Sequence, residues 1–194
     1  MRHRDRFEAI VRADADLMAL LERVRDMGLP QWRLVAGCLY LTVWNALTLR
    51  PRGTGIRDYD VAYYDAGDLS WEAEDAVIRR VTAETRNCVG PVEVRNQARV
   101  HLWFEQRFGS CAYPQLSSAD EALQYYASIA HAVGVRLEAN GQLDVVAPFG
   151  LNDVFDMIVR PNRALANAAS FDSKAARMKA IWPEVVLVSW GKDN

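Results

Sequence analysis

The sequence predicts an α/β fold in which a mixed sheet is flanked by helices, with a small α+β extension toward the C-terminus. Through residues 1–111, short apolar runs typical of strands alternate with helical patterns. A β-hairpin signal follows, in which Asn140-Gly141 separates two apolar runs. The apolar fraction of 51% over 194 residues is enough for a proper hydrophobic core.

The first half supplies the strands and helices that carry the candidate site. Residues 5–27 are expected to form one amphipathic helix, because apolar side chains recur there at intervals of three and four residues. A strand at 32–35 then turns at Ala36-Gly37 into a helix at 38–49, which is apolar nearly all round and therefore buried. After a loop rich in Pro and Gly, a strand at 57–64 carries two aspartates.

The later elements are predicted from capping and turn signals. Ser70 is the expected N-cap of a helix reaching about residue 86. Ser118 and Glu121 form a capping-box pattern, which predicts a helix to about residue 130. The remaining expected elements are a strand at 92–95, a helix at 96–104, hairpin strands at 133–137 and 143–146, short helices at 150–158 and 172–182, and a strand at 185–188.

No linker composition separates the two halves, so we expect one compact body. Its predicted parts are a core at 1–111 and an α+β extension at 112–194 that packs on it.

Composition excludes several classes of partner. The net charge of −2 gives no strong signal for nucleic-acid binding. No apolar run reaches the ~18 residues that a membrane span requires, and the charged N-terminus is not typical of a signal peptide. Cys38, Cys88 and Cys111 are odd in number and match no zinc spacing, so free thiols in a cytoplasmic protein are expected.

Two carboxylates on one strand are the most informative feature of the chain. Asp58 and Asp60 are two residues apart, so their side chains should project from the same face. Adjacent carboxylates repel each other unless a proton or a cation lies between them. Hard oxygen ligands suit Mg²⁺, which accompanies nucleotide phosphates, so the pair indicates phosphoryl or nucleotidyl transfer.

These motifs resemble the nucleotidyltransferase superfamily, to which polymerase beta belongs. Its signature is a glycine turn, paired aspartates and a third carboxylate on a later strand. Here these are Ala36-Gly37-Cys38, Asp58-Tyr59-Asp60 and Glu93. Further blocks resemble a poorly characterised bacterial family of predicted nucleotidyltransferases. They are Asp58-Tyr-Asp-Val-Ala-Tyr-Tyr-Asp65 with Trp44, Asn96-Gln-Ala-Arg-Val-His101, Val133-Gly-Val-Arg-Leu137, Ala147-Pro-Phe-Gly-Leu151 and Val159-Arg-Pro-Asn162.

The resemblance implies a mixed sheet of the nucleotidyltransferase type and a Mg²⁺- or Mn²⁺-dependent enzyme. Such an enzyme moves a nucleoside monophosphate from an NTP to a hydroxyl or phosphate acceptor, here expected to be a small molecule. Asp58, Asp60 and Glu93 would be the catalytic and metal-binding residues. Gly37 and Cys38 would contact the phosphates at the start of the helix.

Other residues have a structural interpretation beside the functional one. Glu93 shares a strand face with Arg95, so a surface salt bridge is the alternative to a role in the site. A polar cluster follows that strand and consists of Asn96, Gln97, Arg99 and His101. Of these, Asn96, Arg99 and His101 are candidate substrate-binding residues. Tyr113, Tyr125, Tyr126, Phe149 and Phe155 suit either the wall of a small-molecule site or a core.

Three departures from the family pattern motivate a second hypothesis. Cys38 stands where Gly or Ser is frequent, and Tyr40 and Leu41 stand where an Arg-Asn pair is frequent. Each replacement removes a polar group near the expected phosphates. The alternative is therefore a catalytically impaired nucleotide- or protein-binding module on the same fold. A metal-dependent phosphohydrolase is a weaker third hypothesis, because the chain clusters few additional carboxylates or histidines.

Overall fold

A five-stranded mixed sheet forms the centre of the computed structural model, which describes residues 3–109 and 112–191. The strand order is β3-β2-β1-β4-β5. β2 and β3 are parallel, and the other three pairs are antiparallel. The strands are β1 (Arg33–Val35), β2 (Tyr59–Tyr63), β3 (Val92–Asn96), β4 (Gly134–Leu137) and β5 (Leu143–Val146). A separate parallel pair joins β6 (Ile158–Val159) to β7 (Val186–Leu187).

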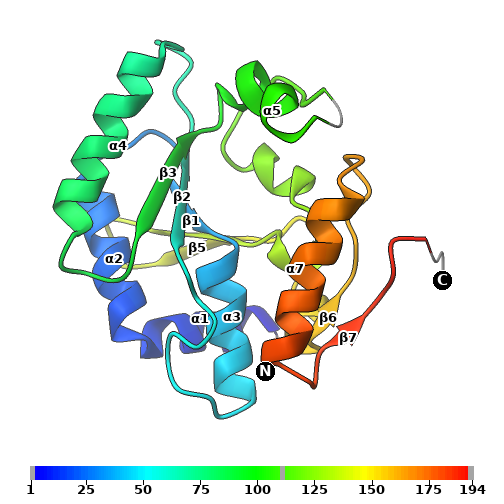
Figure 1. The fold of residues 1–194 in the computed structure, drawn as a ribbon. Helices are drawn as coiled ribbons and strands as arrows, with labels where there is room; N and C mark the ends of the chain where they lie inside the picture. Colours follow the sequence, from blue (N-terminus) through cyan, green and yellow to red (C-terminus); the bar gives the residue numbers. More distant parts are fainter. Residues whose placement is uncertain (1–2, 110–111, 192–194) are drawn as a thin grey trace.

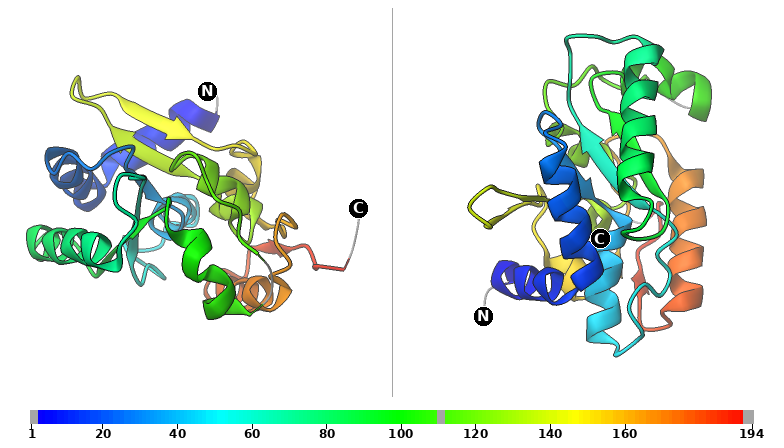
Figure 2. Two further views of the ribbon diagram at one scale, coloured as in Figure 1. Left: turned by 90° about the horizontal axis from the view of Figure 1, so that it is seen from above. Right: turned by 90° about the vertical axis from the view of Figure 1, so that its left-hand side faces the viewer.

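Helices lie on both sides of this sheet. α2 and α4 lie on one side, and α5 and α7 lie on the other (Figures 1 and 2). The helices are α1 (His3–Ala13), α2 (Ala15–Asp26), α3 (Gly37–Leu47), α4 (Trp71–Thr85), α5 (Val100–Phe108), α6 (Asn152–Phe155) and α7 (Ala168–Ile181), with 3-10 turns at Glu121–Tyr125 and Ile129–His131. The mixed α/β class predicted from the sequence is confirmed.

The main hydrophobic core surrounds α3, as its apolar composition predicts. Trp44 is fully buried, and its indole N–H donates to the carbonyl oxygen of Val154 at 2.8 Å. Its ring meets Trp182 edge-on at 5.5 Å. These contacts connect α3 to α6 and to the end of α7.

The prediction of one helix over 5–27 is wrong, because two helices meet at Asp14. The Asp14 backbone is extended, and its carboxylate accepts hydrogen bonds from the N–H groups of Asp16 and Leu17 at 3.1 Å. This is an N-cap, and it starts α2 in the middle of an otherwise continuous apolar pattern. The apolar periodicity continues across the break, so it could not reveal it.

The predicted helix at 118–130 is also wrong. Ser118 does accept a hydrogen bond from the Glu121 N–H, at 3.1 Å, but the helical turn that follows is short. Asp120 forms an ion pair with buried Arg33, and Ser128 forms a β-bridge with Pro161. A continuous helix could not make the bridge, so these tertiary contacts override the local capping signal.

Most of the other elements lie where the sequence places them. Ser70 caps α4 by accepting from the Ala73 N–H at 3.2 Å. The hairpin of β4 and β5 turns at Gly141, whose φ of +79° lies in the left-handed region that glycine favours. The predicted helix at 96–104 begins later, at Val100, because Asn96 still belongs to β3.

The hairpin strands come from the part of the chain after residue 111, yet β4 pairs with β1 in the central sheet. The sheet thus joins both halves of the chain, while their division into a core at 1–111 and an extension at 112–194 stays a prediction. No helix in residues 3–109 and 112–191 combines the length and the apolar character needed to cross a bilayer.

Candidate functional site

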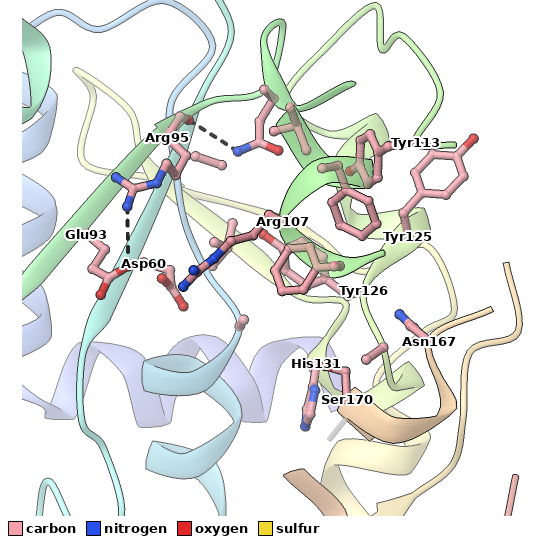
Figure 3. Close-up of a pocket in the computed structure, with 18 of the residues that line it drawn as sticks. Asp60, Glu93, Arg95, Arg107, Tyr113, Tyr125, Tyr126, His131, Asn167 and Ser170 are labelled. Atoms are coloured by element: carbon pink, nitrogen blue, oxygen red, sulfur yellow. Dashed lines mark hydrogen bonds and ion pairs between the residues drawn. The ribbon is translucent and has the colours of Figure 1, made fainter. Parts of the chain in front are cut away.

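Three adjacent strands form a row of side chains on one face of the sheet. Val35 of β1 is the register partner of Asp60 of β2, and Asp60 is the partner of Glu93 of β3. Partners in neighbouring strands share a face, so the Asp60 and Glu93 carboxylates project to the same side. Both line a cavity of about 590 Å³ (Figure 3).

The cavity is closed by segments that are far apart in the sequence. The sheet forms one side, α5 and residues 113–127 form a second, and the first half of α7 forms a third. Ala36, at the amino end of α3, also lines it. A volume of this size is typical of small-molecule sites.

Asp60 is the most perturbed carboxylate of the cavity. Burial and the negative charges of Asp58 and Glu93 together raise its pKa to about 6. Lys174 and Arg95 oppose this shift. The local charge therefore favours either a proton on Asp60 or a cation beside it.

Asp58 lies just before β2 rather than within it, and it is absent from the cavity lining. Its charge nevertheless acts on Asp60. The structure thus couples the two aspartates electrostatically, as their spacing predicts, but it places only Asp60 in the cavity wall. Within the described residues, no three His, Cys, Asp or Glu side chains form a group that could enclose a metal ion.

The position of Glu93 suits both of its sequence interpretations. It lines the cavity beside Asp60, and it also forms a loose ion pair with Arg95 at 3.9 Å (Figure 3). Its side chain is 54% exposed. Such an exposed pair contributes little to stability, so the carboxylate remains accessible for a ligand.

Of the glycine turn, Ala36 lines the cavity, whereas Gly37 and Cys38 lie outside its lining. Ala36 has φ +56° and ψ −118°, a conformation that non-glycine residues rarely adopt. Gly37 then begins α3, and the first N–H groups of a helix have no partner within it. Cys38 is buried, and its thiol donates to the carbonyl oxygen of Val35 at 3.5 Å rather than pointing into the cavity. Burial raises the pKa of this thiol well above its ordinary value.

Two of the departures from the family pattern are core residues here. Tyr40 is buried, with its ring stacked on His131 at 4.6 Å and its hydroxyl 3.4 Å from the sulfur of Met178. Leu41 is buried in the main core. Neither residue lines the cavity, so neither side chain is placed to contact a ligand there.

Of the polar cluster after β3, Gln97 lines the cavity, whereas Asn96, Arg99 and His101 lie outside its lining. Asn96 holds the loop after β2, since its amide donates to the carbonyl oxygen of Asp65 at 2.8 Å and accepts from the Asp65 N–H at 3.0 Å. Arg99 forms a buried ion pair with Glu74 and donates to the carbonyl oxygen of Leu69 at 2.8 Å. His101 is half-buried on α5. The structure thus does not bring these three candidates to Asp60.

Two cations that sequence reasoning missed do reach the cavity. Lys174 of α7 and Arg107 of α5 both line it, and Figure 3 shows Arg107 directed toward Asp60. Neither cation forms a hydrogen bond or ion pair with another residue of the described ranges. Burial lowers the pKa of Lys174, and the Asp60 charge opposes that shift.

A sequence signal for the α5 side existed. Val100, Trp103, Phe104, Arg107 and Phe108 line the cavity, and their spacing of three and four residues places them on one helical stripe. Lys174 had no comparable signal, because only the tertiary fold brings α7 opposite the sheet.

Two comparisons with known proteins, one by family and one by structure, found matches to the chain. Residues 22–187 match a protein family described as Nucleotidyltransferase. A solved NMR structure, described as revealing a CCA-adding enzyme head domain, superposes with a TM-score of 0.76. It is 23% identical and the match covers 94% of each chain, so it supports the fold. No curated protein matches the chain. The family match spans most of the sequence, and the chain therefore belongs to this nucleotidyltransferase family of transferases.

Proposed function

We propose that this protein transfers a nucleoside monophosphate from an NTP to a hydroxyl or phosphate acceptor in the cavity beside Asp60. The observation that carries the proposal is the opposition of charges across that cavity. Asp60 and Glu93 lie side by side on the sheet, and Lys174 and Arg107 face them from α7 and α5. Family membership supplies the general reaction.

The donor set fits a Mg²⁺ ion, or Mn²⁺. Mg²⁺ in nucleotide sites is commonly held by one or two carboxylates together with substrate phosphates and water. Asp60 and Glu93 supply two such carboxylates, and the repulsion that raises the pKa of Asp60 would be relieved by a cation. Asp58 would add negative charge nearby. Bound there, the ion would neutralise phosphate charge and help to orient the reacting groups.

The remaining groups would bind the triphosphate and the acceptor. Lys174 and Arg107 would pair with phosphate oxygens, and the N–H groups of Gly37 and Cys38 at the start of α3 would donate to others. The acceptor oxygen attacks the α-phosphorus. The bond between the α-phosphorus and the oxygen that bridges it to the β-phosphorus breaks, and pyrophosphate leaves. For a hydroxyl acceptor, the released proton would pass to Glu93, which is exposed in the cavity.

The test measures nucleotide binding and pyrophosphate release in parallel. The parent protein should bind NTP only with Mg²⁺ or Mn²⁺, and should release pyrophosphate with a suitable acceptor. Asp60→Asn and Glu93→Gln should lose turnover by two orders of magnitude or more while keeping the far-UV spectrum. Asp26→Asn is the matched control, since Asp26 lies at the exposed end of α2.

Undiminished turnover in both Asp60→Asn and Glu93→Gln would contradict the proposal. Metal-dependent NTP binding without pyrophosphate release over a broad acceptor panel would instead favour the impaired binding module. NTP breakdown with no acceptor present would favour the phosphohydrolase.

A further inference from the structure

One wall of the cavity is aromatic, which phosphate chemistry alone does not explain. The residues of this aromatic wall are Trp103, Phe104, Phe108, Tyr113, Tyr125 and Tyr126. Four of their rings form a continuous series. Phe108 lies 4.7 Å from Phe104, Phe104 lies 4.7 Å from Tyr113, and Tyr113 lies 5.4 Å from Tyr125, measured between ring centroids.

The wall is separate from the main hydrophobic core. Trp103, Phe104, Tyr113 and Tyr125 belong to a small cluster of their own with Val100 and Leu116. Phe108 is 53% exposed at the end of α5. An exposed aromatic side chain that continues a wall of other rings marks a surface available to an apolar ligand. The neighbouring carboxylates and cations lie on other sides of the same cavity.

Polar atoms without partners lie beside this wall. The side-chain oxygen Oδ1 of Asn167 and the ring nitrogen Nε2 of His131 are buried, and neither has a hydrogen-bond partner in the described part of the chain. Both residues line the cavity, as does Ser170 (Figure 3). Burial and the charges of Lys174 and Arg177 lower the pKa of His131 to about 3, so its imidazole is neutral.

A stacking surface with neutral polar groups at its edge matches a particular ligand chemistry. Planar rings stack on aromatic side chains whatever their substituents. A neutral imidazole and a carboxamide can donate to or accept from the ring's polar edge. Charged phosphates, in contrast, gain nothing from such a surface.

We propose that the aromatic wall binds a planar aromatic ring by stacking, with Asn167 and His131 as partners for the polar edge of that ring. The ring is either the nucleobase of the NTP or part of the acceptor, which present the same chemistry to the wall. The inference rests on the proposed function, which places the triphosphate beside the aromatic wall. Ring binding by the wall is tested separately from phosphate binding.

The experiment compares ligands with and without a ring. Calorimetric titration, with Mg²⁺ throughout, would measure the affinity of the protein for each ligand. The ligands are the four common NTPs, inorganic tripolyphosphate, adenosine, phenol, tyramine and 1-naphthol. The protein variants are the parent, Phe108→Ala, Trp103→Ala and Phe149→Ala. Phe149 is 43% exposed and lies outside the cavity lining, so its loss matches that of Phe108 in size and exposure.

Two results support the proposal and identify the ring. If the ring is the nucleobase, an NTP binds the parent about tenfold or more tightly than tripolyphosphate. Phe108→Ala and Trp103→Ala then remove that advantage without changing tripolyphosphate affinity. If the ring belongs to the acceptor, NTP and tripolyphosphate bind alike, and a ring compound without phosphate binds the parent and loses about tenfold in both variants. Phe149→Ala behaves as the parent in either case.

The proposal is overturned if no ligand with a ring loses affinity in Phe108→Ala or Trp103→Ala. Asp60→Asn distinguishes this failure from a failure of the proposed function. If the proposed function is right, that variant loses Mg²⁺-dependent tripolyphosphate binding and keeps ring binding. If tripolyphosphate never binds while ring compounds bind through the wall, the proposed function fails and the ring-binding surface stands.

Discussion

The Cα atoms of Asp60 and Glu93 are register partners across the parallel strands β2 and β3, so two carboxylates face the same cavity from adjacent strands. Glu93 has a loose ion pair with Arg95, at 3.9 Å. In the described part of the chain Asp60 forms no ion pair, and only the longer-range charges of Lys174 and Arg95 act on it. This concentration of negative charge is the property from which the first prediction follows.

The ionisation of Asp60 should make the folded protein less stable as the pH rises. Its pKa is raised from 3.8 to about 6 in the folded protein, so the folded state holds the proton more tightly than the unfolded chain does. The free energy of unfolding therefore falls between about pH 4 and pH 6, by at most about 3 kcal/mol.

The variant Asp60→Asn removes this pH-dependent penalty. Urea unfolding without metal at pH 5 and pH 8 should show its stability advantage over the parent growing by about 1 to 2 kcal/mol. Asp26→Asn, at the exposed end of α2, should show no such trend. An advantage of equal size at both pH values would mean that Asp60 is ionised throughout.

Lys174→Met should weaken NTP binding. Removing the cation that faces Asp60 leaves phosphate oxygens with one donor fewer, and we expect the KM for NTP to rise about tenfold or more. Because the Lys174 charge lowers the pKa of Asp60, the acidic limb of the pH profile for kcat/KM should move to higher pH. Lys174→Arg should restore both quantities in part, whereas an unchanged KM in Lys174→Met would remove Lys174 from the site.

Arg99→Met should destabilise the protein rather than impair the chemistry. Glu74 is 1% exposed, and its carboxylate accepts from Arg99 and from the Asn96 N–H. Removing the guanidinium leaves a buried charge unpaired, at an expected cost of about 3–5 kcal/mol in thermal or urea unfolding.

A second substitution checks the origin of that loss. Glu74→Gln in the Arg99→Met background keeps an acceptor for the Asn96 N–H and removes the charge, so stability should recover in part. A selective loss of NTP affinity in Arg99→Met, with stability unchanged, would instead support the phosphate-binding role that the sequence suggested.

Ala36→Gly should stabilise the turn into α3. Ala36 has a φ of +56°, which glycine adopts without the steric cost that a Cβ atom incurs. We expect a gain of about 1 kcal/mol in the free energy of unfolding. Ala176→Gly, in the exposed middle of α7, should lose about 1 kcal/mol instead. A loss in both variants would show that the turn carries no strain.

The sequence predicted much of the local structure because the relevant signals are local. The hairpin turn at Gly141, the Ser70 cap and the apolar helix around Trp44 each depend on residues close in the chain. The register that sets Asp60 beside Glu93 is not local, but the strand assignments placed each carboxylate on the correct element.

What the sequence could not supply depends on contacts between distant segments. The sequence around Arg99 is the same whether its guanidinium binds phosphate or Glu74. Its partner is Glu74 because α4 packs against β3. Lys174 is far from Asp60 in the chain and meets the cavity because α7 closes it. The break at Asp14 was hidden because the apolar periodicity continues on both sides of it.

The separation of the aromatic cluster from the main core has a consequence for how this enzyme can diversify. Substitutions among Trp103, Phe104 and Phe108 alter a patch that contributes little to the interior around α3, while the carboxylates stay fixed on sheet strands. If the aromatic wall binds a ring as proposed, ligand preference can change through substitutions on one short helix while Asp60 and Glu93 stay in place on the sheet. Relatives with the same carboxylates but a different stripe on α5 would be expected to act on different molecules.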